Sequence, residues 1–132
     1  MKQPFVTLKQ VKEIVKTYPT PFHLYDEKGI LENIRRTKQA FSWNPGFQEY
    51  FAVKAAPTPG LLNLFLQEGM GLDCSSYTEL MLAEALGASG NRIVFSSNCT
   101  PKEDFAYAHK LGAIINLDDY SDIDTIAQMF SP

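Results

Sequence analysis

The most constraining feature of this sequence is a strand–helix pattern that repeats four times after residue 49, with a spacing of roughly 21 residues. Short apolar segments predict four strands, at residues 50–53, 72–74, 93–95 and 114–117. Strand–helix alternation of this regularity indicates parallel strands joined by right-handed crossovers. The fold class is therefore predicted to be α/β.

Helix start and stop signals follow each predicted strand. The starts are Thr58-Pro59, Ser76 with Glu79, Thr100-Pro101 with Glu103, and Ser121 with Asp124. Glycines stand where three of the helices are expected to end: Gly69, Gly87 and Gly112.

Two architectures could hold such units, an open doubly wound sheet or a barrel. The segment 54–60 after the first strand has no glycine-rich phosphate loop, which an open nucleotide-binding sheet would favour. The strand ends carry polar residues, including Lys54, Asp73, Asn98 and Asp118, and a barrel places its chemistry at those ends. We therefore predict a (β/α)8 TIM barrel, of which four units form the N-terminal half.

The residues before the repeat predict three further elements. Thr7 and Gln10 form a capping-box pattern before an amphipathic helix that ends near Pro19. Residues 22–25 predict a short strand, and Asp26 is expected to cap a helix that reaches Phe41. We place a boundary between residues 1–24 and a half-barrel at 25–132. Four strands would leave two open apolar edges, so we expect a fragment or a truncated reading frame.

Lys54 allows two interpretations. It follows an apolar strand and shares a face with Tyr50 and Ala52. It could lie just past the strand end and reach water, as lysine readily does. Alternatively, burial could lower its pKa so that its amine forms a Schiff base. The spacing alone leaves both open.

Composition excludes several classes of function. The net charge of −3 gives no basic footprint, so nucleic acid is not expected as a partner. The sequence contains no apolar run long enough for a membrane span or a secretion signal, and no membrane partner is expected. Cys74 and Cys99 fit a reducing cytoplasm, and neither has a second ligand at zinc spacing.

Several linked motifs carry a family resemblance. They are FAVKA at 51–55, GMGLDCSSYTEL at 69–80, RIVFSSNCTPK at 92–102 and INLDD at 115–119. In this order and spacing they resemble the N-terminal half of the fold-type III pyridoxal-phosphate decarboxylases, which have an alanine racemase-like barrel. Residues 20–26 look like the family's opening, where the chain leaves a second, β-rich domain; residues 1–24 would belong to that region.

The resemblance implies a cofactor and site residues. Lys54 would hold pyridoxal phosphate and be displaced by the amine of an amino-acid substrate. Asp73 matches the family's acidic residue near this lysine, although an acceptor of loop amides is the alternative. Asn98 could line the cofactor pocket or simply form a turn. Glu79 also matches a family glutamate, but its capping role explains it sufficiently.

The resemblance also implies a function. We expect a fragment of an amino-acid decarboxylase, with diaminopimelate decarboxylase of lysine biosynthesis as the leading identity. Ornithine, arginine and carboxynorspermidine decarboxylases are alternatives, and a non-catalytic pyridoxal-phosphate-binding or regulatory protein is an alternative of another class. The family's other cofactor and substrate groups lie in later segments. The 132-residue chain alone is therefore expected to be inactive. The full-length protein is expected to be a cytoplasmic homodimer.

Overall fold

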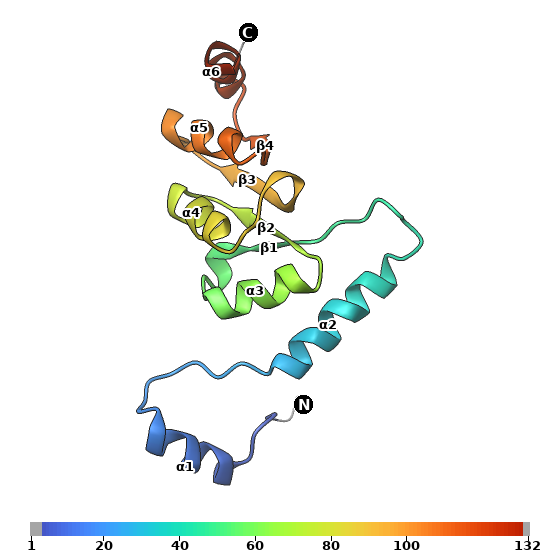
Figure 1. The fold of residues 1–132 in the computed structure, drawn as a ribbon, viewed down its shortest axis with the longest axis vertical. Coiled ribbons are helices and arrows are strands. Elements are labelled where there is room, and N and C mark those ends of the chain that lie inside the picture. The colour runs from blue at the N-terminus through green and yellow to red at the C-terminus, as the bar shows by residue number, and fades with distance from the viewer. Residues whose placement is uncertain (1–3, 131–132) are drawn as a thin grey trace. The chain divides into compact units, whose positions relative to one another are not determined.

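The computed structural model describes residues 4–130 and divides into two compact units, residues 1–37 and 38–132 (Figure 1). The predicted boundary between residues 24 and 25 differs from the boundary between the two units, which lies between residues 37 and 38. The assignment of residues 1–24 to a β-rich domain stays a prediction. Residues 131–132, where the sequence pattern ends, lie outside the described residues. No helix among residues 4–130 has the length and apolar character needed to cross a membrane.

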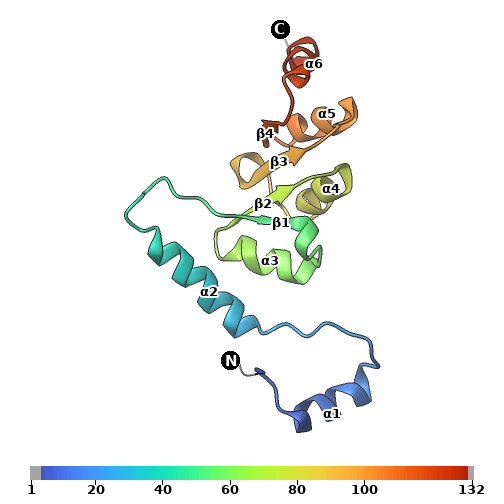
Figure 2. The ribbon, with the colours of Figure 1, turned by 180° about the vertical axis from the view of Figure 1, so that it is seen from behind.

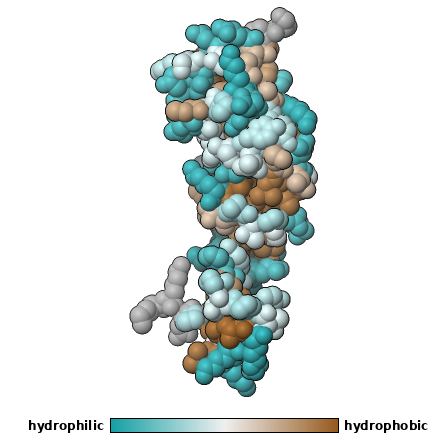
Figure 3. Space-filling model, turned by 90° about the vertical axis from the view of Figure 1, so that its left-hand side faces the viewer, coloured by the Kyte–Doolittle hydropathy of each residue, from teal (hydrophilic) through white to brown (hydrophobic). Residues whose placement is uncertain are grey.

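The first unit contains helix α1 (Leu8–Thr17) and most of helix α2 (Glu27–Ala40). The capping box of α1 is confirmed, because the Gln10 N–H donates to Thr7 Oγ1 at 3.3 Å and the Thr7 N–H donates to Gln10 Oε1 at 2.8 Å. The apolar side of α1 is exposed, with Leu8 71% accessible, and hydrophobic atoms reach the surface in this region (Figure 3).

The predicted strand at residues 22–25 is wrong. The structure has no strand there, because a strand needs a backbone partner and every strand pairing among residues 4–130 lies within the four-stranded sheet of the second unit.

The second unit is built on a parallel sheet. Its strands are β1 (Tyr50–Ala52), β2 (Gly71–Cys74), β3 (Ile93–Ser97) and β4 (Ile114–Leu117). They lie in the order β1-β2-β3-β4, and each neighbouring pair is parallel (Figure 2). This order matches consecutive barrel strands, whereas a doubly wound sheet reverses its order at a switch point. The four predicted strands and their parallel pairing are confirmed.

Helices follow every strand of the sheet. They are α3 (Pro59–Gln67), α4 (Tyr77–Ala85), α5 (Lys102–Lys110) and α6 (Ser121–Phe130), with short 3-10 turns at Val53–Ala55 and Gly90–Arg92. Three of the helices end in the same way, at the predicted glycines. In α3 the Met70 N–H donates to Phe65 O and the Gly69 N–H donates to Leu66 O, which is a Schellman motif. Gly69 adopts φ 83°, which glycine reaches without strain.

Two predicted helix starts differ from the structure. Thr100 forms no capping box with Glu103, because Pro101 takes the N-cap position. The Thr100 hydroxyl instead donates to Ser97 O at 3.0 Å. At α6 the predicted box of Ser121 with Asp124 is replaced by an earlier acceptor. The Ser121 N–H donates to Asp119 Oδ1 at 2.8 Å, since a short acidic side chain readily accepts from a backbone amide two residues ahead.

One face of the sheet packs against helices. The rings of Phe51 and Phe65 stack at 4.1 Å between centroids, and Phe95 meets Phe105 edge to face at 6.2 Å. Leu72 on the same face is fully buried. The pairing register places a different set of residues on the opposite face, which we call the open face: Tyr50, Ala52, Asp73, Val94, Ser96, Ile114 and Asn116. The exposure of Ile114, 48%, shows how little covers this face at β4.

Candidate functional site

Lys54 lies in a tight turn immediately after β1. The strand ends at Ala52, and residues 53–55 form a 3-10 turn that the Ala56 N–H closes by donating to Val53 O at 3.1 Å. Val53 is fully buried and anchors this turn in the core, while Lys54 is exposed. Lys54 thus lies past the strand end and is exposed in this chain, as the first interpretation expects. Its role as a Schiff-base lysine stays a prediction.

Asp73 lies on the neighbouring strand, on the open face. Its backbone pairs in register with Ala52 of β1 and with Val94 of β3, so it is the acidic exception among small and apolar neighbours. Its Oδ1 atom is buried and has no hydrogen-bond partner among the described residues. Burial raises the pKa of Asp73, and the positive charge of Lys54 opposes that rise. The two side chains are thus electrostatically coupled at the carboxyl ends of adjacent strands.

Glu79 serves the start of α4. Its carboxylate accepts a hydrogen bond from the Ser75 N–H at 2.7 Å, one residue earlier than the predicted capping box would place it. The Ser76 hydroxyl accepts from the Glu79 N–H at 3.4 Å, which is the other half of that box. Cys74, which precedes this turn, is fully buried, and burial raises its pKa to about 12, so its thiol stays protonated.

Asn98 belongs to the turn after β3. It is exposed there, and it lines a shallow pocket of about 380 Å³. The other lining residues are mostly acidic or small: Cys99, Asp118, Asp119, Ser121 and Asp122. A role for Asn98 in cofactor binding stays a prediction.

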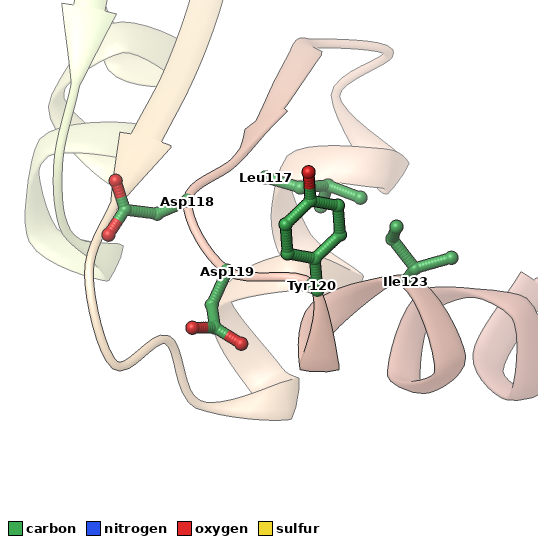
Figure 4. Close-up of a pocket in the computed structure, with 5 residues that line it drawn as sticks. All are labelled: Leu117, Asp118, Asp119, Tyr120 and Ile123. Atoms are coloured by element: carbon green, nitrogen blue, oxygen red, sulfur yellow. The ribbon is translucent and has the colours of Figure 1, made fainter.

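An adjoining pocket of about 370 Å³ is formed after β4. Figure 4 shows that its two carboxylates, from Asp118 and Asp119, point to one side, whereas Tyr120 and Ile123 form the other side. Neither pocket includes Lys54 or Asp73.

The sequence interpretation missed one polar pair on the open face. The Asn116 side-chain amide donates to the Ser96 hydroxyl oxygen at 3.0 Å across β3 and β4. The available signal was strand alternation, which puts Ser96 on the face of Val94 and Asn116 on the face of Ile114.

Comparison with known proteins identifies the family. Residues 27–131 match the pyridoxal-binding domain of pyridoxal-dependent decarboxylases. The chain belongs to this family. Protein TabA of Pseudomonas amygdali pv. tabaci is 52% identical over 114 residues, which cover 86% of this chain and 27% of that protein. Diaminopimelate decarboxylase of Deinococcus radiodurans is 32% identical over 108 residues, or 82% of this chain and 28% of that protein.

Solved structures agree with this assignment. Diaminopimelate decarboxylase from M. jannaschi superposes with a TM-score of 0.82 at 27% identity, covering 88% of this chain and 28% of that one. A lysine decarboxylase structure in complex with pyridoxal phosphate and cadaverine gives a TM-score of 0.81 at 26% identity, covering 97% of this chain and 33% of that one. The chain therefore spans about a quarter to a third of the length of these relatives.

These findings confirm two predictions from the sequence. The chain has the TIM-barrel fold of the pyridoxal-phosphate decarboxylases, of which it carries the N-terminal strand–helix units. Its cofactor is pyridoxal phosphate. The described residues fit that cofactor, because an exposed lysine follows a strand end and interacts electrostatically with a carboxylate that has one buried oxygen without a partner among the described residues.

Proposed function

We propose that this chain is the lysine-bearing part of a pyridoxal-phosphate-dependent amino-acid decarboxylase. The observation that carries the proposal is the electrostatic interaction of Lys54 with Asp73. Asp73 pairs in register with Ala52, two residues before Lys54, and keeps a buried oxygen without a hydrogen-bond partner among the described residues. Parallel barrels place their chemistry at this edge, and unpartnered buried polar atoms are rare unless a ligand or water meets them.

Each residue has a distinct proposed role. The amine of Lys54 would carry the cofactor covalently until the substrate amine displaces it. Asp73 would hold a proton or orient an amine beside Lys54, and its raised pKa suits a carboxyl group that is uncharged for part of its working cycle. When bound, pyridoxal phosphate supplies the electron sink for loss of carbon dioxide. Asn98 would contribute to cofactor binding from the turn after β3.

We propose meso-diaminopimelate as the substrate, with lysine and carbon dioxide as the products and lysine biosynthesis as the role. Four relatives named diaminopimelate decarboxylase, at 30–35% identity, support this choice. The ornithine decarboxylase of Nicotiana glauca, at 33% identity, is an equally close decarboxylase, so ornithine is the first alternative substrate. The unpaired thiols of Cys74 and Cys99 suit the cytoplasm, and a homodimer is proposed by analogy with the family.

The test uses what we call the completed protein: this chain joined to the remaining segments of a family member. Lys54→Ala should remove the visible absorbance of bound pyridoxal phosphate and nearly all carbon dioxide release from diaminopimelate. Lys102→Ala is the matched control, because Lys102 is also exposed but lies at the start of α5. Unchanged absorbance in Lys54→Ala would reject the proposed role of Lys54.

The same experiment distinguishes the non-catalytic alternative. Absorbance of bound cofactor without carbon dioxide release from diaminopimelate, ornithine, lysine or arginine would favour a pyridoxal-phosphate-binding or regulatory protein over a decarboxylase.

A further inference from the structure

On the open face of the sheet, two successive rows of side chains differ in polarity. Ala52, Asp73, Val94 and Ile114 are aligned across the four strands by the pairing register, and Asp73 is the polar exception among them. Two residues further along β3 and β4, Ser96 and Asn116 are aligned with each other on the same face. Lys54 follows the end of β1, in the 3-10 turn at residues 53–55. The carboxyl-end row of this face is therefore polar, and the row below it is mostly apolar.

The hydrogen bond between Ser96 and Asn116 leaves the hydroxyl proton of Ser96 available to a further acceptor. The Asn116 amide donates to Ser96 Oγ at 3.0 Å, so an acceptor site of the hydroxyl is used and its own proton is free to donate. The hydroxyl of Ser96, which is half-buried, is held by this bond in a fixed position. A cross-strand pair of this kind presents one directed donor toward the space above the sheet.

Charge limits what this donor can meet. Asp118 and Asp119 follow β4 directly, and Asp73 lies on the neighbouring strand β2, so a doubly charged phosphate would be repelled here. An oxygen that is uncharged or carries a single, delocalised charge is compatible. The ligand expected at Lys54 offers two such oxygens, the ring hydroxyl oxygen of pyridoxal phosphate and the carboxylate of an amino-acid substrate.

We propose that the Ser96 hydroxyl, held by Asn116, is a binding residue that donates a hydrogen bond to an oxygen of the ligand carried by Lys54. This inference rests on the proposed function of Lys54 and adds a further polar contact point on β3, two strands away from β1. The bond would fix the orientation of the ligand across the sheet, since Lys54 alone leaves rotation about its own side chain free.

The test measures ligand binding in the completed protein, with one arm for each oxygen. The first arm titrates pyridoxal phosphate by visible absorbance without any amino acid. If the ring oxygen is the acceptor, Ser96→Ala should weaken the apparent affinity for pyridoxal phosphate about tenfold, the value expected for one directed hydrogen bond to a polar or charged group.

The second arm compares displacement of the cofactor from Lys54 by lysine and by cadaverine, which differ only by a carboxylate. If that carboxylate is the acceptor, Ser96→Ala should weaken lysine about tenfold and leave cadaverine unchanged.

Matched variants separate this role from a structural one. Ser96→Thr keeps the hydroxyl and should retain most of the affinity, and Asn116→Leu should reproduce the direction of the Ser96→Ala effect by freeing the hydroxyl. Ser89→Ala makes the same chemical change at an exposed turn and should change neither arm. If Ser96→Ala leaves both arms unchanged while the wild type binds normally, the inference is overturned and the proposed function stands. If the wild type shows no absorbance of bound cofactor, the proposed function is overturned, and this inference with it.

Discussion

The ring of Tyr50 lies over Gly71 on the neighbouring strand, and its hydroxyl donates to the carbonyl oxygen of Asn91 at 2.7 Å. A Cβ atom at Gly71 would collide with this ring and would also approach the backbone oxygen of Arg92 at 2.8 Å. The absence of a side chain at residue 71 is therefore what allows Tyr50 to lie across β2 and tie β1 to the turn before β3.

Gly71→Ala should destabilise the chain. The added methyl group has no free space, and overpacking of this kind costs about 1–3 kcal/mol. Gly60→Ala is the control, because nothing lies within 4 Å of its added Cβ and Gly60 is in the first turn of α3. It should be neutral or stabilise by up to about 1 kcal/mol. Urea unfolding followed by circular dichroism measures both, and equal midpoints for the two variants would contradict the packing argument.

Asp73→Asn should stabilise the fold at neutral pH. The raised pKa means that the folded state holds the Asp73 proton more tightly than the unfolded state does. The wild type therefore loses stability as the pH rises from the unfolded value near 3.8 through the raised folded value. The asparagine variant does not have this dependence. Unfolding midpoints measured across the acid range should diverge as the pH rises, and parallel curves would show that burial of Asp73 carries no such cost.

Asp119→Asn is the control of opposite sign. Hydrogen bonds from the Ser121 hydroxyl and the Ser121 N–H lower the pKa of Asp119. Its contribution to stability is therefore present above the unfolded pKa of about 3.8 and is lost as the pH falls through the lowered folded value. The variant should be less stable than the wild type at neutral pH, and the difference should shrink in acid.

Asp73, whose burial is expected to lower stability at neutral pH, should also support activity. In the completed protein, Asp73→Ala should retain the absorbance of bound pyridoxal phosphate but lower turnover by about 10²–10³-fold, the usual contribution of one positioned polar group. Strongly reduced carbon dioxide release together with unchanged absorbance would agree with this role. A fully active variant would reduce Asp73 to a structural residue.

The two thiols should react very differently. Burial raises the pKa of Cys74 to about 12, whereas Cys99 is exposed in the turn after β3. A thiol reagent such as Ellman's reagent should modify one cysteine in the folded chain and both after unfolding. Cys99→Ser should remove the reaction of the folded chain. Rapid labelling of Cys74 in the folded state would show that β2 is not part of a stable core.

The local rules that predicted the fold from the sequence were those that act within one element. Short apolar segments located β1 to β4. The glycines at 69, 87 and 112 located three helix ends, because a positive φ at the helix end favours glycine. The strand predicted at 22–25 failed because β structure depends on a partner that the local sequence does not specify. The predicted capping boxes failed at Thr100, because the helix begins one residue later with Pro101 as its N-cap, and at Ser121, because the Asp119 carboxylate accepts from the Ser121 N–H.

The candidate site was predictable in its residues and less so in its environment. The strand ends drew attention to Lys54 and Asp73, and the family resemblance implied their roles, which stay predictions. The exposure of Lys54 was left open, since it depends on where β1 ends and how the turn at 53–55 forms. The contact between Ser96 and Asn116 required the register of β3 against β4, which a single sequence does not reveal.

The 132-residue chain alone should self-associate through its open sheet edge. Among the described residues β4 is an edge strand, and Ile114 and Leu117 on it are 48% and 36% exposed. Unpaired strands with apolar side chains invite pairing with another copy, and a lysine on such a strand opposes it. Ile114→Lys should therefore reduce the mass measured by light scattering toward that of a monomer. Ile123→Lys places the same charge on α6, where Ile123 is 50% exposed, and should have a smaller effect. We also expect the chain alone to release no carbon dioxide from diaminopimelate. A wild-type chain that scatters as a stable monomer, or that decarboxylates this substrate, would contradict the prediction.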